Sequence, residues 1–421
     1  MSGITANKFY TETVPQILFL WSIIIDSVNG AFQAFFGIHL PIGIIFRGAM
    51  LLLLFPKGFY LKGNGYNKFF LLLTGAYILC MLAWLMVGNN FSITEEAGVL
   101  FRFIYFFVVL FYFYHYRNAF DKRKITAYVV IAATLVAVTN IYCFATDNGI
   151  KSYDNEFGFG VKAFFADGNS LGLYMVLSLC LAIWNAYYRR GIQWWLCAIV
   201  ITAGTLLIGT RAALMGPIAA WAAIVLFCTF TRDRLVRMSF LKRLLVVAMT
   251  AVTIIYAIIP LLEFLMTFSG FYMDKFSKEA LVSPREALIS EGIKVIDRYE
   301  GHELVIGNGV SGGLYALGEL YDSDGAVKSI EADFYDAILS YGWWFGSLMI
   351  LINVVLACKL IFPAFRRLNS LTFTTAMIGA VWLFAAYIAG HGFFNTMLAP
   401  ILGLTLVLAN NYGYDMRIDK P

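Results

Sequence analysis

Apolar residues gather in long runs along this chain, and with one exception the polar segments between the runs are short. Runs of this length cross the roughly 30 Å hydrocarbon core of a bilayer as helices. The pattern therefore predicts an all-α polytopic membrane protein whose residues 1–421 form a single transmembrane domain. We predict twelve spans, near residues 14–37, 40–56, 69–88, 98–116, 125–146, 168–187, 194–209, 212–230, 241–265, 334–361, 373–390 and 395–411.

The exception is a long polar stretch at residues 266–332, which we expect to be a large loop on one face of the membrane. Part of this loop has the signature of an amphipathic helix, with an N-cap, a first-turn proline, a capping-box glutamate and one apolar side: Ser283, Pro284, Glu286, Leu288, Ile289, Val295 and Ile296. The glycines that follow predict a flexible turn region: Gly307, Gly309, Gly312 and Gly313.

The composition agrees with a membrane protein. Apolar residues make up 60 % of the chain, charged residues make up 14 %, and the mean hydropathy is +0.75. An average soluble domain carries about 25 % charged residues. The polar segment before the first span does not resemble a cleaved signal peptide. All cysteines fall within or at the edge of apolar runs, so we expect neither disulfides nor a thiolate metal site.

Lysine and arginine are divided unevenly between the two predicted faces. Nineteen lie in the short loops and tails of one face, and three lie in the short loops of the other: Lys151, Lys162 and Arg211. Because the richer face is cytoplasmic, we predict that both termini are cytoplasmic and that the loop 266–332 is on the outer face. The net charge of +5 is explained by this asymmetry and does not indicate a nucleic-acid partner.

The loop enters the span 334–361 through a carboxylate-rich junction made by Glu331, Asp333 and Asp336. Carboxylates are costly in hydrocarbon, so this junction marks a place where an aqueous reaction can meet a lipid-borne substrate. The alternative interpretation is a helix start, because the helix dipole favours acidic residues in the first turn.

Three arginines lie at or near the predicted outer face: Arg102 near the end of a span, Arg211 in the short turn at the outer end of a span, and Arg285 in the long loop. Their planar guanidinium groups bind phosphate oxygens through two hydrogen bonds, and a lipid pyrophosphate is an anion at this depth. The alternative is that each side chain reaches the interface or pairs with an acid of the loop. For Arg47, near mid-depth, we expect an ion pair with Asp26.

Other polar and aromatic residues are weaker candidates. His391 lies at the outer end of the eleventh span, and no two histidines have metal-ligand spacing on one helix. Asn169, in DGNSLGLYM, begins the sixth span and is either a substrate-binding residue or a helix cap. We expect Trp343 and Trp344 to lie too deep for an interfacial belt and to pack against helices.

The order of three motifs is similar to that of the O-antigen ligase and polymerase superfamily: DGNSLGLYM, then GTRAALMG, then a long outer loop, over roughly residues 165–350. The family pattern ends with His-Asn and a later Gly-x-x-Gly. With Gly342 on the first glycine, Glu331 takes the place of the histidine and Ala332 that of the asparagine, and the second glycine comes one residue late, at Gly346. An acidic residue at the histidine position resembles the polymerase branch more than the ligase branch.

The resemblance implies an inverting glycosyltransferase of the bacterial inner membrane that acts at its periplasmic face. The implied donor is a glycan on undecaprenyl pyrophosphate and the acceptor is a lipid-linked repeat unit, with no metal or other cofactor and with a chain-length regulator as a candidate protein partner. Glu331 is the candidate base and Asp333 the second candidate. Arg211, Arg285 and Arg102 are candidates for the pyrophosphate, and Asn169, Asp336 and His391 are weaker candidates for substrate binding.

Two other functions remain open at this point. An O-antigen ligase uses the same donor but transfers the glycan to the core sugar of lipid A, so only the acceptor differs. A polysaccharide or lipid transporter also fits twelve spans. However, transporters often have two related halves and broken helices near mid-membrane, whereas the halves of this chain look unrelated and its polar residues gather on one face.

Overall fold

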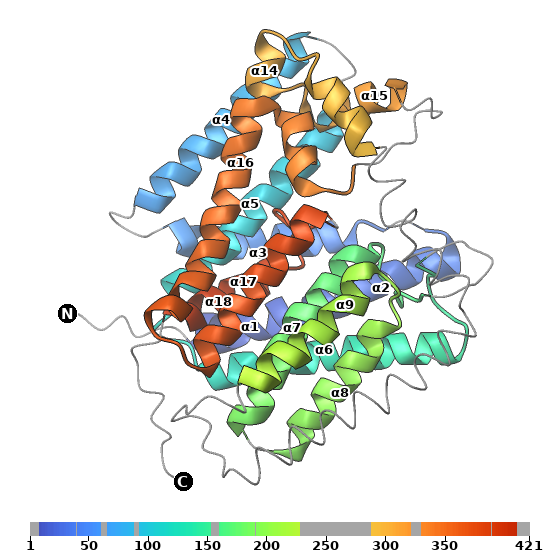
Figure 1. Cartoon of the computed structure of the whole chain (residues 1–421), viewed down its shortest axis with the longest axis vertical. Helices are drawn as coiled ribbons and strands as arrows, with labels where there is room; N and C mark the ends of the chain where they lie inside the picture. The colour runs from blue at the N-terminus through green and yellow to red at the C-terminus, as the bar shows by residue number, and fades with distance from the viewer. Residues whose placement is uncertain are drawn as a thin grey trace.

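The computed structural model describes residues 8–38, 40–59, 65–87, 92–152, 160–189, 191–227, 288–320, 330–388 and 390–410. These residues form helices and irregular segments, and within them the only β-type pairing is an isolated antiparallel bridge between Lys151 and Val161. Figure 1 shows the helices packed side by side in a bundle. The predicted all-α class is therefore confirmed for this part of the chain.

The helices labelled in Figure 1 follow the predicted apolar runs closely. Short π-helical turns at Phe9–Thr13 and Ile17–Trp21 join α1 to α2 in one long N-terminal helix, and another at Trp221–Val225 extends α9. The bounds are α1 Val14–Gln16, α2 Ser22–Phe36, α3 Ile42–Phe59, α4 Gly65–Val87, α5 Ile93–His115, α6 Lys122–Ala145, α7 Gly168–Arg189, α8 Ile192–Leu206, α9 Arg211–Ala220, α14 His302–Ile306, α15 Gly309–Leu320, α16 Asp333–Arg366, α17 Ser370–Ile388 and α18 Ala399–Asn410.

Twelve full spans were predicted, and the structure supports this number in part. Among the described residues, seven helices are long and apolar enough to cross a membrane: Phe9–Phe36, Asn67–Val87, Ile93–His115, Lys122–Ala145, Gly168–Arg189, Asp333–Arg366 and Ser370–Ile388. Four other apolar helices are shorter: Ile42–Pro56, Ile192–Leu206, Arg211–Val225 and Ala399–Asn410. A 15-residue helix such as α8 is only about 22 Å long. The predicted span 241–265 lies outside the described residues.

Helix α7 is the centre of the bundle. All of its residues from Ser170 to Tyr187 are buried, and it packs against α6, α8, α9 and α17. The neighbouring helices also approach closely, because a Cβ atom on Gly204 of α8 would lie 2.5 Å from the Cα atom of Ala137 on α6. Small residues at such crossings let membrane helices pack tightly. The position of the α7 N-terminus is therefore fixed by the surrounding helices.

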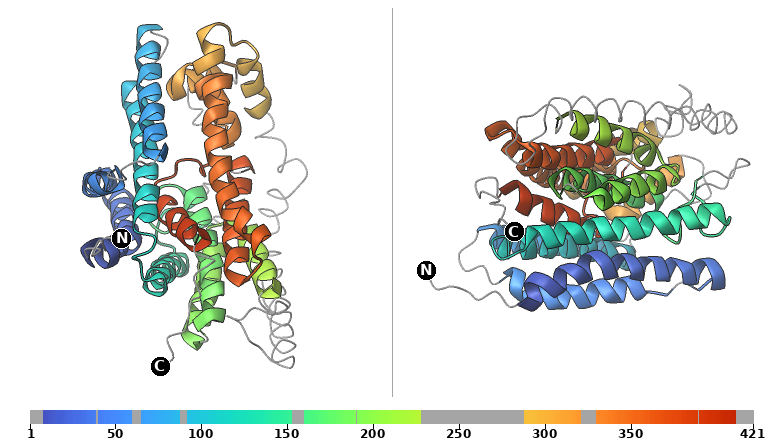
Figure 2. Two further views of the ribbon diagram at one scale, coloured as in Figure 1. Left: turned by 90° about the vertical axis from the view of Figure 1, so that its left-hand side faces the viewer. Right: turned by 90° about the horizontal axis from the view of Figure 1, so that it is seen from below.

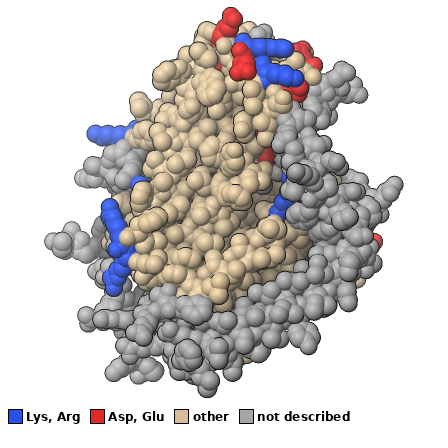
Figure 3. All heavy atoms as spheres, in the orientation of Figure 1, with Lys and Arg blue, Asp and Glu red and all other residues tan. Residues whose placement is uncertain are grey.

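The outer helices expose apolar side chains instead. Leu52 is 77 % exposed, Leu72 72 % and Met86 86 %, which suits contact with lipid tails. Figure 3 shows the same property on one face, where a broad area without charged side chains lies below a group of acidic and basic residues. Within the N-terminal pair of helices, Arg47 donates to Asp26 at 2.5 Å. This contact confirms the predicted Asp26–Arg47 ion pair.

Helix α16 is bent sharply near its start, which corrects the prediction of one continuous span over 334–361. Gly342 has φ 69° and ψ −179°, so residues 333–341 form a separate short helix. This short helix lies against the long one, because a Cβ atom on Gly346 would be 2.5 Å from the carbonyl oxygen of Ala337. Trp343 and Trp344 consequently stand at the start of the long helix and are 48 % and 72 % exposed. These exposures do not bear out the prediction that both side chains pack against helices.

The described part of the long loop is helical and rests on this bend. Residues 288–296 form the predicted amphipathic helix, whose Val295 and Ile296 are buried, while its predicted start lies outside the described residues. Gly307 and Gly309 have positive φ at the turn that leads into α15, whereas Gly312 and Gly313 lie within α15, which corrects the prediction of a flexible turn for these two residues. Figure 2 shows α14 and α15 at the same end of the bundle as the bend of α16.

Close contacts hold the loop helices in place. A Cβ atom on Gly307 would lie 2.4 Å from the carbonyl oxygen of Ser340, so glycine is required where the loop meets the bend. Tyr299 donates its hydroxyl hydrogen to the carbonyl oxygen of Leu339. Burial, and secondly the charge of Glu303, raises the pKa of Tyr299, so this phenol remains a donor. The loop and the bend therefore form one packed unit.

Candidate active site

Glu331 occupies a strained turn just before α16. It lies between the buried residues Ile330 and Ala332, and its φ of 58° is left-handed. This conformation costs a residue other than glycine about 1–2 kcal/mol. A Cβ atom on Gly390 would lie 2.7 Å from the main-chain carbonyl carbon of Glu331. The surrounding structure therefore imposes the turn, and such imposed strain is concentrated at functional sites.

Asp333, the first residue of α16, holds a loop from the other side of the site. Its carboxylate accepts three main-chain hydrogen bonds from the segment after α17: from His391 at 2.7 Å, from Gly392 at 2.7 Å and from Phe393 at 2.8 Å. We call residues 390–395 the 390–395 loop. Since both carboxylate oxygens of Asp333 are bonded to this loop, Asp333 connects the start of α16 to the end of α17.

Asp336 holds the turn that contains Glu331. Its two carboxylate oxygens accept from the main-chain N–H groups of Ile330 at 2.8 Å and of Ala332 at 3.2 Å. Asp336 thus binds the main chain on either side of Glu331, whereas Asp333 binds the 390–395 loop, whose Gly390 packs on the main chain of Glu331. Glu331 is half-buried at the centre of this arrangement.

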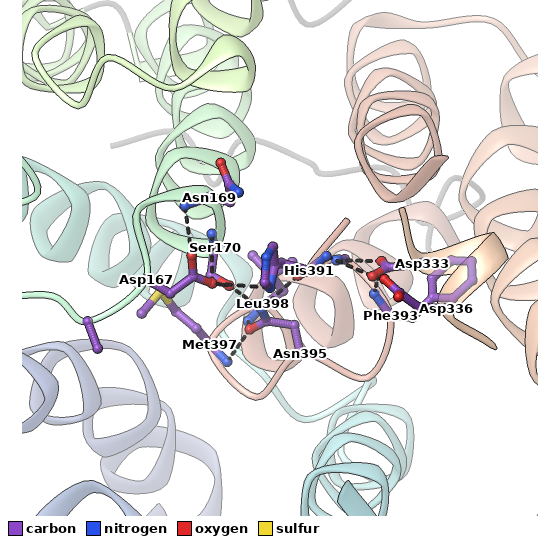
Figure 4. A network of polar contacts seen from close by, with 12 residues as sticks. Asp167, Asn169, Ser170, Asp333, Asp336, His391, Phe393, Asn395, Met397 and Leu398 are labelled. Atoms are coloured by element: carbon purple, nitrogen blue, oxygen red, sulfur yellow. Dashed lines mark hydrogen bonds and ion pairs between the residues drawn. The ribbon is translucent and has the colours of Figure 1, made fainter. Parts of the chain in front are cut away.

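The side chain of His391 connects the 390–395 loop to the central helix. Its Nδ1 atom lies 3.6 Å from the Oδ2 atom of Asp167, and the two side chains are 37 % and 39 % exposed. Asp167 caps the start of α7 by accepting from the main-chain N–H groups of Asn169 at 2.9 Å and Ser170 at 3.2 Å. Figure 4 shows this network from Asp333 through His391 to Asp167.

Asn395 fixes the same loop at its other end. Its amide nitrogen donates to the Oγ atom of Ser170 at 2.6 Å and to the carbonyl oxygen of His391 at 2.8 Å. Its side-chain oxygen accepts from Met397 at 2.9 Å, at the approach to α18. Trp382 of α17 also donates to the carbonyl oxygen of Gly392 at 2.9 Å. The 390–395 loop is consequently held at several points despite its irregular backbone.

The predicted arginines are placed differently. Arg211 is the half-buried first residue of α9, next to the start of α7, because a Cβ atom on Gly172 would lie 2.8 Å from the Oγ1 atom of Thr210. Arg102 is exposed on α5 and lies within electrostatic reach of Tyr341. Arg285 lies outside the described residues. The structure thus places one predicted pyrophosphate-binding residue beside the α7 end of the network.

Three residues of the network were missed by the sequence analysis: Asp167, Ser170 and Asn395. The helix-capping pattern of the first two, Asp-Gly-Asn-Ser before an apolar run, was a usable signal. Asn169 was singled out instead, and Figure 4 shows its side chain directed away from the network. Among the described residues, no group of three or more His, Cys, Asp or Glu side chains has the arrangement of a metal site.

These features define a polytopic helical membrane protein with a polar site where the ends of several helices meet. A family model described as O-antigen ligase like membrane protein matches residues 12–274. This match covers more than half of the chain, so the protein belongs to that family, and the resemblance found in the sequence is confirmed. Members of this family carry out glycosyl transfer of the polysaccharide ligase and polymerase kind at the membrane. A comparison with curated proteins found no match.

The matched region and the site overlap only in part. Asp167, Asn169 and Arg211 lie within the match, whereas Glu331, Asp333, Asp336 and the 390–395 loop lie after its end. The resemblance noted over residues 165–350 therefore extends beyond the matched region at its C-terminal end. For the C-terminal half of the site, the assignment of roles rests on the geometry of this protein.

Proposed function

We propose that this protein is an inverting glycosyltransferase that polymerises oligosaccharide repeat units carried on undecaprenyl pyrophosphate. The reaction takes place at the periplasmic face of the bacterial inner membrane, with both termini in the cytoplasm. The growing glycan on its lipid pyrophosphate is the donor, and a single lipid-linked repeat unit is the acceptor. A chain-length regulator is a candidate protein partner, and the reaction uses no metal or other cofactor.

One observation carries the proposal. Acidic and basic groups from separate parts of the chain meet where the starts of α7, α9 and α16 and the end of α17 come together. Helices α7, α16 and α17, which meet here, are long and apolar enough to cross a membrane, which suits a substrate carried on a lipid. Polar groups that are costly in hydrocarbon and gather at such a site indicate a functional site.

Glu331 is the candidate base. Transfer requires a group within hydrogen-bond reach of the acceptor hydroxyl to take its proton. Asp333, the second candidate, uses both carboxylate oxygens to hold the 390–395 loop, and Asp336 holds the turn before α16. We therefore assign proton removal to Glu331 and positioning to Asp333 and Asp336.

The leaving pyrophosphate needs donors that stabilise its developing negative charge, and such electrostatic stabilisation is often the largest contribution to catalysis. Arg211 is the first candidate because it lies beside the α7 end of the site. Arg285 and Arg102 are further candidates. The energy for transfer is already present in the phosphoanhydride of the lipid carrier.

The ligase is the alternative function, because the family includes both kinds of transfer. The acidic residue at position 331, where the ligase pattern has a histidine, favours the polymerase. A transporter is the more distant alternative. It would be favoured if Asp26 and Arg47, which form an ion pair between α2 and α3, were essential while Glu331 was not.

The test is an assay of the purified protein with undecaprenyl-pyrophosphate repeat units from its host. A product ladder spaced by whole repeats, formed without lipid A core, supports the polymerase. Transfer that appears only when core lipid is added identifies a ligase. If neither condition gives glycan transfer, the glycosyltransferase proposal fails.

A further inference from the structure

His391 and Asp167 form a pair that neither the positioning of the loop nor the capping of α7 requires. The loop is held through main-chain atoms of residue 391, which its side chain does not affect. The cap of α7 uses the oxygens of Asp167 on main-chain N–H groups. The imidazole ring is nevertheless placed with Nδ1 toward Asp167 and 37 % of the side chain exposed.

The backbone at His391 supports a function for this side chain. His391 has φ 62°, a left-handed conformation that glycine adopts without cost. It lies between two glycines, Gly390 and Gly392, so the chain keeps a costly residue at the centre of a glycine-flanked turn. A residue observed in a strained backbone conformation supports the hypothesis that this residue has a function.

The ring geometry defines what the side chain can do. An imidazole whose Nδ1 faces a carboxylate donates from that nitrogen, and its Nε2 atom lies on the opposite side of the ring. In the doubly protonated ring Nδ1 is paired with the Asp167 carboxylate, whose Oδ2 atom lies 3.6 Å away, and Nε2 can donate to a ligand. Gly390, the residue before His391, packs on the main chain of Glu331, so the two residues belong to the same part of the site.

We infer that His391, oriented by Asp167, is a catalytic residue that donates its Nε2 proton to the departing phosphate oxygen of the donor. This inference rests on the proposed glycosyl transfer and adds an acid to the base Glu331. The anionic ligand is a phosphate group attached to a sugar at its anomeric carbon. Asp167 is a positioning residue in this step.

The acceptor oxygen forms a bond to the anomeric carbon, and the bond from that carbon to the phosphate oxygen breaks. The electron pair of the broken bond stays on the phosphate oxygen, which takes the Nε2 proton of His391. Glu331 takes the proton of the acceptor hydroxyl. Afterwards His391 gains a proton from water and Glu331 releases one to water.

Chemical rescue tests the inference directly. His391→Gly suits the left-handed backbone, keeps the main-chain N–H that Asp333 binds, and leaves space for a free imidazole. We expect its turnover to fall about 100-fold, the lower end of what an acid or base group contributes, and to recover in part when imidazole is added. His391→Asn also tolerates this backbone, but it should show the same loss without recovery because its side chain fills the space.

Two further variants separate orientation from structure. Asp167→Asn keeps one of the two oxygens that accept from the start of α7, and asparagine is as good an N-cap as aspartate. We expect turnover to fall about fivefold, the size of a half-exposed ion pair. The double variant Asp167→Asn with His391→Gly should be no slower than His391→Gly alone. His302→Asn, at an exposed histidine of the loop, is the control and should keep the wild-type rate.

The outcomes distinguish this inference from the proposed function. If wild-type protein transfers no glycan, the proposed function itself fails. If wild-type protein is active and His391→Gly stays within twofold of it, the catalytic role of His391 is wrong. A loss in His391→Gly that imidazole does not reverse also overturns the role. Recovery with imidazole in His391→Gly but not in His391→Asn supports it.

Discussion

Glu96 and Asp333 are two carboxylates at helix starts, and each accepts main-chain hydrogen bonds from a distant segment. Glu96 of α5 accepts from Val310 at 2.5 Å and Ser311 at 3.2 Å, which begin α15, and from the hydroxyl of Tyr77 at 3.0 Å. It is fully buried. Asp333 accepts from three consecutive residues of the irregular 390–395 loop, and it is only partly buried.

The difference lies in what each carboxylate holds. The segment bound by Glu96 is the start of helix α15. The chain just before this helix is anchored as well, because the indole nitrogen of Trp84 donates to the carbonyl oxygen of Gly307 at 2.8 Å. The segment bound by Asp333 contains left-handed residues, His391 and Phe394. Main-chain hydrogen bonds to a carboxylate thus hold a helix in place at Glu96 and a strained loop in place at Asp333. We expect activity to depend much more on Asp333 than on Glu96.

Asp333→Asn should have the largest effect of the changes at these two sites. One carboxylate oxygen becomes an NH2 group that faces main-chain N–H donors, so the 390–395 loop loses its position. We expect the rate of repeat-unit transfer to fall about 100-fold or more, measured on detergent-purified protein. Asp297→Asn, an exposed aspartate of the outer loop, is the control. Wild-type activity in Asp333→Asn would contradict a role of this loop in the reaction.

Arg211→Lys tests whether the candidate site that contains Asp333 also binds the pyrophosphate. Lysine keeps the charge but loses the two-pronged hydrogen-bond geometry of arginine. We expect turnover to fall about 10- to 100-fold, approaching the cost of removing one donor to a developing oxyanion. Arg366→Lys, at an exposed position at the other end of α16, should have no effect. Equal rates for the two variants would remove Arg211 from the site.

Gly309→Ala tests the Glu96 side by steric conflict. The added Cβ would lie 2.6 Å from the Oε1 atom of Glu96, and φ at this position is +77°. We expect destabilisation of about 1–3 kcal/mol, read as a lower melting temperature in detergent, with activity largely kept at low temperature. Gly318→Ala in the same helix has no atom within 4 Å of the added Cβ and serves as control. An unchanged melting temperature of Gly309→Ala would mean that the contact between Glu96 and the start of α15 does not stabilise the fold.

Glu96→Gln should have the smallest effect. The amide oxygen of glutamine can still accept from Val310 and Ser311, and its NH2 group can donate to the hydroxyl oxygen of Tyr77. We expect transfer rates within about twofold of wild type, since neutral hydrogen bonds replace charged ones of similar geometry. A loss as large as that of Asp333→Asn would end the distinction between the two carboxylates.

The membrane helices were predictable because each follows an apolar run of the sequence. The bend in α16 was not, since nothing in the sequence around Gly342 distinguishes a bend from a continuous helix. It is required by contact with a distant segment: a Cβ atom there would lie 2.5 Å from the carbonyl oxygen of Glu303. The lengths of α8 and α9 likewise depend on turns that hydropathy does not show.

The site was predictable in its residues more than in its contacts. Glu331, Asp333, Asp336 and His391 stood out because polar groups at span ends are costly. Their grouping depends on tertiary packing that joins α16 to a loop about 60 residues later, with separations of 58 to 60 residues for the three bonds of Asp333. Asp167 was missed because its capping role is local while its contact with His391 is not.

The most direct test of this account compares Glu331→Gln with Glu95→Gln in the repeat-unit assay. Glu95 is an exposed glutamate in the first turn of α5, so its variant controls for loss of a negative charge at a helix start. We predict that Glu331→Gln inserts normally and forms no ladder, whereas Glu95→Gln forms the wild-type ladder. A full ladder from Glu331→Gln would contradict the assignment of Glu331 as the base.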